Sequence, residues 1–428
     1  MSYKEELLGD YIDILSGFAF KTKDFVDKGV PIIKIKNISP PCVTLDDLTY
    51  VSNEVAEKQK KFILSYDDVL IAMTGSHINQ WASVVGRVAR VKYSNKTLLN
   101  QRVGKITIKN NAEADIDYIY YYLSLDTVKI ELAAKAGGAA NQANISPAHI
   151  KGLSFPCPDL ATQKKIGSTL RFYDDLIENN QKQIKLLEEA AQRLYKEWFV
   201  NLHFPGYENV KLVDGVPEGW ENVPLRNMIS FDIGGGWGKE NIKEKNEKPA
   251  YVIRGTDFYG ITHGDMSSIP FRYHTESNLS ARILQDGDIV FEVSGGSKTE
   301  GVARTLLIRN EMLESYGSPV ICASFCKLLR VTELPYSQYV YDTFQFLRYS
   351  GKTAEFDKKS ASSIVNYRWK DFLAQQNILV PPHSILDTYN CLAESFYHQI
   401  INHSKQIESL KNARDRLLPK LMSGEIEV

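Results

Sequence analysis

The sequence predicts a mixed α/β fold in which two globular domains alternate with two long helices. Three observations predict it: a helical segment repeated at an offset of 223 residues, a heptad pattern in both copies, and strand-like apolar runs before each copy. We expect the two helices to pair with each other as an antiparallel coiled coil. A pseudo-two-fold internal repeat would then relate the two halves of the chain.

The first predicted element is a globular domain over residues 1–158. Apolar runs such as "VPIIKIKNI" and "DVLIAMTG" are bounded by Gly, Asp and Pro, which is typical of strands joined by turns. The tyrosine-rich stretch "DYIYYYLSL" would suit a stacking platform, but its spacing fits an amphipathic helix packed on a sheet better. We therefore predict that these tyrosines belong to the core.

A long helix is predicted over residues 159–203. Its mainly apolar residues alternate spacings of four and three, which indicates a coiled-coil seam. At ~1.5 Å per residue, such a helix is on the order of 60 Å long and serves as a spacer rather than a core element. The predicted seam positions are Ile166, Leu170, Tyr173, Ile177, Asn180, Ile184, Leu187, Ala191, Leu194 and Trp198.

A linker over residues 204–220 and a second globular domain over residues 221–382 follow. The stretch "FPGYENVKLVDGVPEGWENVP" holds three prolines and three glycines in 21 residues, a composition typical of a linker. The second domain repeats features of the first. "DGDIVFEVSGG" lies over "YDDVLIAMTGS" and pairs Asp288 with Asp68, while "LRNMISFDIG" lies over "LGDYIDILSG" and pairs Gly234 with Gly17.

The last predicted element is a second long helix over residues 383–428. A polar residue occupies the same seam position in both helices, Asn180 and His403. A buried polar position can fix the register of a coiled coil, and the alternative is that both side chains face solvent at a gap in the seam. The other seam positions of this helix are Tyr389, Ala393, Phe396, Ile400, Ile407, Leu410, Arg414, Leu417 and Leu421.

The formal net charge of −1 excludes a pervasively basic nucleic-acid-binding protein at the level of the whole chain. The distribution of charge is more informative, because residues 69–112 contain no Asp or Glu. The basic residues of this stretch predict either a positive surface or a solvated face whose acidic partners come from elsewhere in the fold. They are Arg87, Arg90, Lys92, Lys96, Arg102, Lys105 and Lys109.

Motif analysis argues against an enzyme. The stretch "IGGGWGKE" has Ile233 in place of the first glycine of a P-loop, and no G-x-S-x-G elbow, H-E-x-x-H helix or kinase set is present. Scattered histidines predict no metal site. Five cysteines without a CxxC pair predict reduced, mostly buried thiols. Because neither a signal peptide nor a long apolar run is found, we expect a cytoplasmic protein without a membrane partner.

Several segments resemble the specificity subunit of type I restriction-modification systems, the HsdS family. The order of globule, helix, globule and helix is that of this family. The segments that carry the resemblance are "GFAFKTKDF", "DVLIAMTG", "GGAANQANIS", "FPCPDLATQKKI", "LYKEWFVNLHFPG", "VPEGW" and "LLPKLMSGEIEV".

The resemblance implies that each globule is a target recognition domain that reads one half of a bipartite, asymmetric double-stranded DNA site. The helices would set the spacer between the half-sites. The chain would have no catalysis of its own and would bind no cofactor. It would dock two methyltransferase subunits, which bind S-adenosylmethionine, and through them two restriction subunits that use ATP and Mg for translocation and cleavage.

Loops rich in small, amide and basic residues are the candidate reading surfaces. Asn and Gln pair bidentately with adenine, and Arg or Lys pairs with guanine, whereas basic side chains at phosphates give salt-dependent affinity. Ordinary surface turns use the same residue types, so composition by itself favours no function. The candidate DNA-binding residues are Lys34, Lys36, Thr74, His77, Asn79, Gln80, Arg87, Arg90, Arg102, Lys105, Gln142 and Asn144 in the first domain, and Arg254, Ser297, Lys298, Arg304, Lys358, Asn366 and Arg368 in the second.

Two alternatives compete with this interpretation. A coiled-coil adaptor with two protein-binding globules would need no nucleic acid, and the nearly neutral net charge favours it. A DNA-binding subunit of another multisubunit defence assembly is the second alternative. A methyltransferase gene and a helicase-nuclease gene beside this gene would favour the type I interpretation over both.

Overall fold

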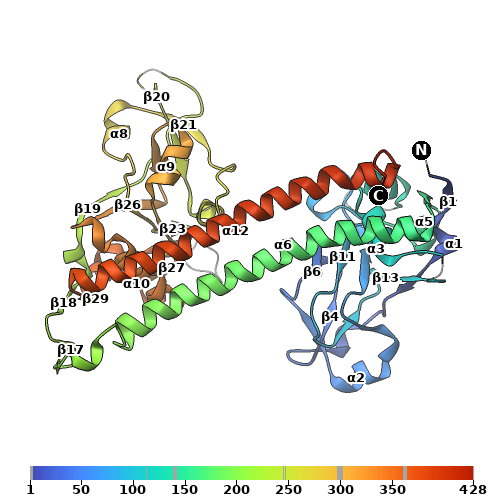
Figure 1. Ribbon diagram of the computed structural model, residues 1–428, viewed down its shortest axis with the longest axis horizontal. Helices are drawn as coiled ribbons and strands as arrows, with labels where there is room; N and C mark the ends of the chain where they lie inside the picture. The colour runs from blue at the N-terminus through green and yellow to red at the C-terminus, as the bar shows by residue number, and fades with distance from the viewer. Residues whose placement is uncertain are drawn as a thin grey trace. The chain divides into compact units, whose positions relative to one another are not determined.

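The computed structural model describes residues 3–111, 113–137, 142–243, 245, 247–295, 302–359 and 364–427. The chain forms two compact units. Unit 1 is Met1–Glu178 with Ser409–Val428, and unit 2 is Asn179–Glu408. Helices α6 (Leu160–Tyr195) and α12 (His383–Ser423), green and red in Figure 1, each give one segment to each unit. Both units combine β-sheets with packed helices, which confirms the predicted mixed α/β class.

Unit 1 is built on a six-stranded sheet with the order β2-β13-β9-β11-β6-β5 and a five-stranded sheet with the order β3-β7-β4-β12-β8. Strand β9 (Val69–Ala72) is buried on both faces, because Val69 and Ile71 face a cluster formed with the helices while Leu70 and Ala72 face the second sheet. The other strands are β1 (Glu5–Leu7), β2 (Ile12–Ser16), β3 (Phe25–Val26), β4 (Val30–Ile33), β5 (Ile38–Ser39), β6 (Cys42–Val43), β7 (Thr49–Val51), β8 (Ile63–Leu64), β10 (Thr74–Gly75), β11 (Val88–Arg90), β12 (Thr97–Leu99), β13 (Val103–Ile108), β14 (Ala143–Asn144) and β15 (Ser154–Pro156).

The tyrosine-rich helix α3 (Ile116–Ser124) is part of the core of unit 1, as predicted. Tyr118, Tyr120, Tyr121 and Tyr122 are all buried, and the first of these hydroxyls donates to the carbonyl oxygen of Pro156 at 2.6 Å. The hydroxyl requires such a partner because burying it unpaired would cost free energy. The remaining helices of unit 1 are α1 (Leu8–Tyr11), α2 (Asn53–Lys58), α4 (Asp126–Lys135) and α5 (Pro147–Lys151).

Unit 2 repeats the strand order of unit 1 in a reduced form. Its sheet β19-β26-β22-β24 corresponds to β2-β13-β9-β11, and its sheet β21-β20-β25 corresponds to β7-β4-β12, including the parallel pairing of the last two strands. The strands are β16 (Leu212–Val213), β17 (Val216–Pro217), β18 (Glu221–Pro224), β19 (Ile229–Gly234), β20 (Lys248–Ile253), β21 (Phe271–His274), β22 (Ile289–Glu292), β23 (Ser294–Gly295), β24 (Thr305–Leu307), β25 (Val320–Cys322), β26 (Cys326–Val331), β27 (Asp357–Lys359), β28 (Val365–Tyr367) and β29 (Asn377–Val380). The helices are α7 (Phe258–Thr262), α8 (Glu276–Ser280), α9 (Asn310–Tyr316), α10 (Ser337–Tyr349) and α11 (Trp369–Gln375).

The repeat pairing of Gly17 with Gly234 is wrong by one residue. Strand β19 shifts its register against β26 between Ile229 and Phe231, and such a bulge inserts one residue that β2 lacks. A Cβ atom on Gly17 would lie 2.2 Å from the carbonyl oxygen of Asn100, and one on Gly235 would lie 2.2 Å from that of Ala323. Gly235 is therefore the structural equivalent of Gly17.

Within each unit, the segments of α6 and α12 run antiparallel along a shared seam. In unit 1, Arg414 donates to Asp174 at 2.5 Å, and Leu421 belongs to the same core cluster as Ile166. In unit 2, the two seam polar residues meet, with His403 Nδ1 and Asn180 Oδ1 2.6 Å apart. Asn180 is buried, so the alternative that both side chains face solvent is wrong.

The segment predicted as a linker is an ordered part of unit 2. The rings of Phe204 and Trp220 are both buried and lie 4.8 Å apart, and Phe199 at the end of the helical region lies 4.8 Å from Tyr389. Prolines and glycines here shape turns around the β16–β17 hairpin rather than a free connection. The prolines and glycines of this segment indicated its turns, whereas its aromatic residues determine how it packs within unit 2.

The five cysteines are free thiols. Cys322 and Cys326 are buried, Cys42 and Cys157 are half-buried, and Cys391 is exposed on α12. The prediction of mostly buried thiols thus holds fully for only two of the five. Burial raises the pKa of Cys322 to about 12, which keeps this thiol protonated at neutral pH.

Candidate functional site

A two-stranded ladder extends the end of β9 in unit 1. After Met73 the chain enters β10, which pairs antiparallel with β14 so that Thr74 lies opposite Asn144. The hydroxyl of Thr74 donates to Asn144 Oδ1 at 2.8 Å, and the N–H of Ile145 donates to the carbonyl oxygen of Met73 at 2.9 Å. Two of the predicted DNA-binding residues, far apart in the sequence, are thereby brought together.

Unit 2 contains the same ladder at the end of β22. Strands β23 and β28 pair Ser294 with Asn366, and the serine hydroxyl donates to Asn366 Oδ1 at 2.8 Å. The N–H of Tyr367 donates to the carbonyl oxygen of Val293 at 2.9 Å, as Ile145 does to Met73 in unit 1. A hydroxyl–amide pair at the end of the central strand is therefore a duplicated feature of the two units.

Arg102 adds a positive charge to the ladder of unit 1. Its Nη1 atom lies 3.3 Å from Asn144 Oδ1 and 3.5 Å from the hydroxyl oxygen of Thr74. The residue is exposed, and among the described residues no carboxylate lies within ion-pair distance of it. The guanidinium therefore keeps its charge and most of its donors available to a partner.

The loop between β10 and β11 places amide side chains beside this ladder. Ser76 Oγ donates to the carbonyl oxygen of Gln80 at 2.6 Å and lies 2.8 Å from Ser83 Oγ, which closes the loop on itself. Asn79 and Gln80 are exposed at its tip, His77 is half-buried, and Gln142 is exposed directly before β14. The loop backbone is held while the amides remain free to bind.

Exposed apolar side chains flank the same ladders and were not among the predicted residues. In the loop of unit 1, Ile78 is 56% exposed and Trp81 is 40% exposed, with Lys129 Nζ 5.1 Å from the indole ring. Phe325 of unit 2 is 56% exposed. Polar residue types alone do not predict these apolar side chains. The repeat offset of 223 aligns Phe325 with Arg102, and this alignment is the sequence signal that points to Phe325.

The expected positive surface between Arg87 and Lys109 is largely absent, because acidic partners come from elsewhere in the fold. Arg90 is buried and donates to Asp117 at 2.6 Å, which makes it a poor candidate for a DNA contact. Lys105 pairs with Asp68 at 2.7 Å. Lys92 lies 3.6–3.8 Å from three carboxylates, and Lys96 pairs with Glu57 at 2.7 Å.

Arg87 is a half-buried cation that bonds to carbonyl oxygens rather than to a carboxylate. Its Nη1 atom donates to Ala82 at 2.8 Å, its Nε atom has no partner among the described residues, and burial lowers the pKa of its guanidinium. Its repeat equivalent, Arg304, instead donates to the buried Glu292 at 2.8 and 2.6 Å. The first unit thus retains a positive charge where the second neutralises it.

The remaining predicted cations of unit 1 are also engaged. Lys34 donates to Thr49 Oγ1 at 2.8 Å, and burial together with the neighbouring Lys36 lowers its pKa. Lys36 is paired with Asp47. Their partners make these two lysines weaker candidates for phosphate contacts than Arg102.

Unit 2 holds its predicted residues in two different ways. Arg254 is bidentate to Asp257 at 2.9 and 2.7 Å, which raises its pKa and occupies its donors. Lys358, Asn366 and Arg368 are exposed around β28, where Arg368 donates to the carbonyl oxygen of Glu355 at 2.5 Å. Ser297 and Lys298 lie outside the described residues.

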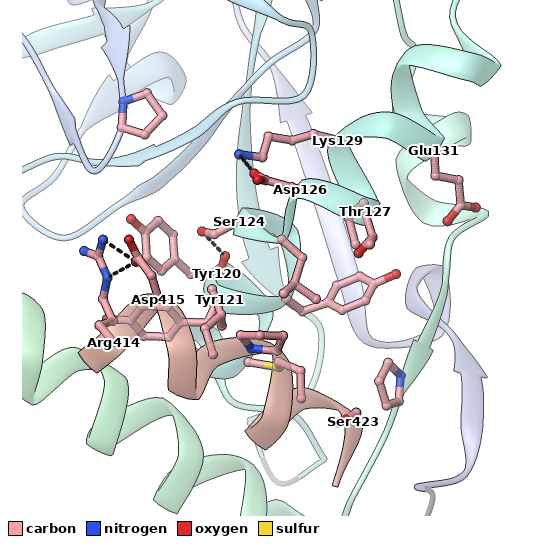
Figure 2. Close-up of a pocket in the computed structure, with 18 of the residues that line it drawn as sticks. Tyr120, Tyr121, Ser124, Asp126, Thr127, Lys129, Glu131, Arg414, Asp415 and Ser423 are labelled. Carbon is pink, nitrogen blue, oxygen red and sulfur yellow. Dashed lines mark hydrogen bonds and ion pairs between the residues drawn. The ribbon is translucent and has the colours of Figure 1, made fainter. Parts of the chain in front are cut away.

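A groove of about 920 Å³ in unit 1 lies between α3, α4 and the end of α12 (Figure 2). Its ionisable groups are paired: Asp174 accepts from Tyr121 at 2.6 Å and from Arg414 at 2.5 Å, and Asp126 pairs with Lys129 at 2.7 Å. Paired carboxylates of this kind are poor acid–base catalysts. More acidic than basic side chains line the groove, which disfavours nucleic-acid phosphates there.

Neither a metal centre nor a membrane-spanning helix is found where the structure is described. No group of three or more His, Cys, Asp or Glu side chains in these residues is arranged to hold a metal ion. Among the same residues, every helix is too short or too polar to cross a bilayer.

Comparison with known proteins shows which family the chain resembles. Residues 3–189 match the family described as "Type I restriction modification DNA specificity domain". The type I restriction enzyme MjaIX specificity subunit of Methanocaldococcus jannaschii is 28% identical over 362 residues, which cover 80% of this chain and 76% of that protein. The chain is thus similar to specificity subunits of type I restriction enzymes.

Other relatives extend the match over nearly the whole chain. The MjaVIII specificity subunit of the same organism is 24% identical over 396 residues, which cover 89% of this chain and 85% of that protein. The crystal structure of the type I S subunit from M. genitalium shares the fold, with a TM-score of 0.58 and 15% identity over 99% of this chain and 96% of that chain. Both curated relatives are named as specificity subunits of type I restriction enzymes.

Proposed function

We propose that each globular domain of this specificity subunit reads one half of a bipartite, asymmetric site in double-stranded DNA. The duplicated hydroxyl–amide ladder carries this proposal, because a feature that occurs once in each unit suits a target with two parts. The surroundings of the two ladders differ, which suits two different half-sites. Thr74, Asn79, Gln80, Gln142 and Asn144 serve the first half-site. His77 joins them at the first half-site. Asn366 and Arg368 serve the second half-site, together with Ser297, Lys298 and Lys358.

Phosphate contacts come from the cations that keep free donors. Arg102 and Arg87 contribute most in this proposal, because neither is neutralised by a described carboxylate. Five other cations contribute only if DNA phosphates displace the side chains that they bind now. They are Lys34, Lys36, Lys105, Arg254 and Arg304. Arg90 is not part of the interface.

The chain assembles with two methyltransferase subunits and, through them, two restriction subunits, and the paired helices set the spacer between the half-sites. Methyl transfer and cleavage then depend on S-adenosylmethionine, ATP and Mg bound by those partners, not by this chain. Phe172 of α6 supports a docking surface on the helices, because it is 62% exposed and lies outside the seam.

Co-expression with the cognate methyltransferase, followed by sequencing of methylated sites in host DNA, tests the proposal. We expect a split, asymmetric motif with adenine methylation that disappears when this gene is deleted. Replacing residues 1–158 with the corresponding domain of another specificity subunit should change one half of the motif and leave the other half intact.

A contrary result would favour the adaptor alternative. If the chain forms a stable complex with the methyltransferase and yet no methylated motif depends on it, the helices bind a partner while the domains do not read DNA. A domain replacement that changes both halves of the motif would separately refute the assignment of one half-site to each domain.

A further inference from the structure

The backbone places Arg102 and Phe325 at the same point of the two duplicated reading ladders. Arg102 directly precedes β13, and Phe325 directly precedes β26. The carbonyl oxygen of Arg102 accepts from the N–H of Met73 at 2.9 Å, and that of Phe325 accepts from the N–H of Val293 at 2.9 Å. Because Met73 and Val293 are each followed by the hydroxyl residue of a ladder, these bonds define equivalent positions.

Features shared by both ladders cannot distinguish the two half-sites. Each ladder has a hydroxyl–amide pair at 2.8 Å, so the pair suits a role in positioning DNA or the reading loops. Discrimination must come from places where the two units present different chemistry on the same framework. The side chains at position 102 in unit 1 and position 325 in unit 2 differ strongly in chemistry. The first is a cation, and the second is an aromatic hydrocarbon.

Both side chains are free to meet a partner. Arg102 is exposed, and within the described part of the chain its guanidinium contacts the Asn144 and Thr74 oxygens at 3.3 and 3.5 Å, which aim one side of the guanidinium at the ladder. Phe325 is 56% exposed, and no aromatic ring or cation of the described residues lies against it. An exposed phenylalanine at a strand entrance is costly in water and suits a surface that becomes covered on binding.

We propose that Arg102 and Phe325 are specificity-determining residues, with Arg102 selecting a guanine in one half-site and Phe325 selecting a thymine in the other. A guanidinium donates bidentately to guanine O6 and N7, which no other base offers in the major groove. A phenyl ring cannot donate, and its favourable contact in the major groove is with the thymine methyl group. This inference rests on the proposed function, since it names which base each domain selects.

Modified bases test the proposal with the wild-type chain in its methyltransferase complex. Once the methylated motif is known, one guanine of the first half-site is replaced by 7-deazaguanine, and one thymine of the second by deoxyuridine. We expect about a tenfold loss of affinity for the first change at a single position and a severalfold loss for the second. No loss at any guanine of the first half-site would overturn the role of Arg102, and no loss at any thymine of the second would overturn that of Phe325.

Substitutions provide an independent measurement. Arg102→Phe should relax or change one position in the first half of the methylated motif only, and Phe325→Arg one position in the second half only. Arg102→Lys keeps the charge without the bidentate geometry, so it should retain affinity better than base preference. Phe325→Ala should abolish the sensitivity to deoxyuridine.

Matched controls lie at the opposite ends of the same two strands. Lys109→Phe removes a cation after β13, and Leu334→Arg replaces an apolar residue that is 58% exposed after β26. Neither should change the motif. If the Arg102→Phe and Phe325→Arg complexes methylate normally and keep an unchanged motif, this inference is refuted and the proposed function is not. If the wild type shows no methylated motif at all, the proposed function itself is refuted.

Discussion

At the residue scale, the two units solve the same local problem with different chemistry. An aspartate closes the turn before the central strand of each unit. The half-buried Asp68 accepts from the N–H of Ser65 at 2.8 Å, and the buried Asp288 accepts from that of Gln285 at 2.7 Å. The cationic partner is a lysine in unit 1 and a bidentate arginine in unit 2. The carboxylate is therefore the fixed requirement of the turn, and its counter-ion is exchangeable.

The exposed amides of the loop after β10 lead to a prediction about base reading. Asn79→Ala combined with Gln80→Ala should change or relax one or more positions in the first half of the methylated motif, because each amide that pairs with a base contributes about 1–3 kcal/mol of discrimination. The measurement is sequencing of methylated sites. Asn95→Ala, an exposed amide on a different turn, serves as the control, and an unchanged motif in the double variant would remove both amides from the reading surface.

At the element scale, the helices combine an apolar seam with one polar contact. Every predicted seam residue from Ile166 in α6 to Trp198 in the π-helical turn after it is buried or half-buried. Asn180 and His403 are repeat equivalents, and they hydrogen-bond to each other within unit 2. Apolar residues drive the pairing of α6 with α12. Any register that separated Asn180 from His403 would cost free energy, because it would leave their polar groups without this hydrogen bond.

Replacing both members of the polar pair should separate stability from specificity. Asn180→Leu with His403→Leu should raise the unfolding temperature, because a buried and a half-buried polar group of the seam are replaced by apolar contacts. Asn180→Leu alone should lower it, because the imidazole loses its hydrogen-bond partner. Thermal unfolding measures both effects. A double variant that is less stable than either single variant would show that the pair stabilises the seam more than apolar packing does.

A second contact joins α10 to α12 and gives a pH dependence. Asp342 Oδ2 accepts from Tyr389 at 2.6 Å and from Gln338 at 2.7 Å, and burial raises the pKa of Asp342 to about 6. An unfolded aspartate titrates near pH ~3.9, so unit 2 binds an extra proton between these values. The stabilisation is complete below about pH 4 and is lost as the pH rises through about 6.

The free energy of unfolding should therefore fall from about pH 4 to about pH 6 by more in the wild type than in Asp342→Asn. The asparagine variant keeps a similar shape but cannot titrate, so the difference between the two curves isolates this carboxyl group. Chemical denaturation across this pH range provides the measurement. Parallel curves would mean that Asp342 does not change its protonation in the folded unit.

At the scale of the whole molecule, local ion pairs neutralise most charges, so the net charge says little about any one surface. The net charge of −1 conceals many internal pairs, and most cations of residues 69–112 are engaged by carboxylates from other segments. If the chain reads DNA as proposed, so few free cations should bind nonspecific DNA only weakly without partner subunits. In the proposed assembly, the methyltransferase subunits therefore supply much of the phosphate contact.

Assembly leads to the last prediction. Phe172→Glu should reduce co-purification of the methyltransferase about tenfold or more, because it places a charge on an exposed apolar position of α6. Phe172→Leu should bind normally and serves as the control. The unfolding temperature should stay unchanged in both variants, since the side chain is 62% exposed. Normal co-purification of Phe172→Glu would place the docking surface elsewhere.

The sequence by itself determined the fold class, the duplicated helices and their seam. Seam positions and the tyrosine-rich helix were predictable because helical periodicity depends on local spacing, and burial follows the apolar stripe. The resemblance to the specificity-subunit family also came from contiguous motifs. The insertion at Ser230 was not predictable, because a bulge is decided by the partner strand.

Only the tertiary structure decided which polar side chains are free. Arg90 and Arg102 are alike in the sequence, yet one is buried against Asp117 and the other is exposed beside Asn144. The pairing of Thr74 with Asn144 and of Ser294 with Asn366 joins residues about 70 positions apart. Ion pairs and cross-strand contacts depend on which distant segments meet, and no local pattern encodes that meeting.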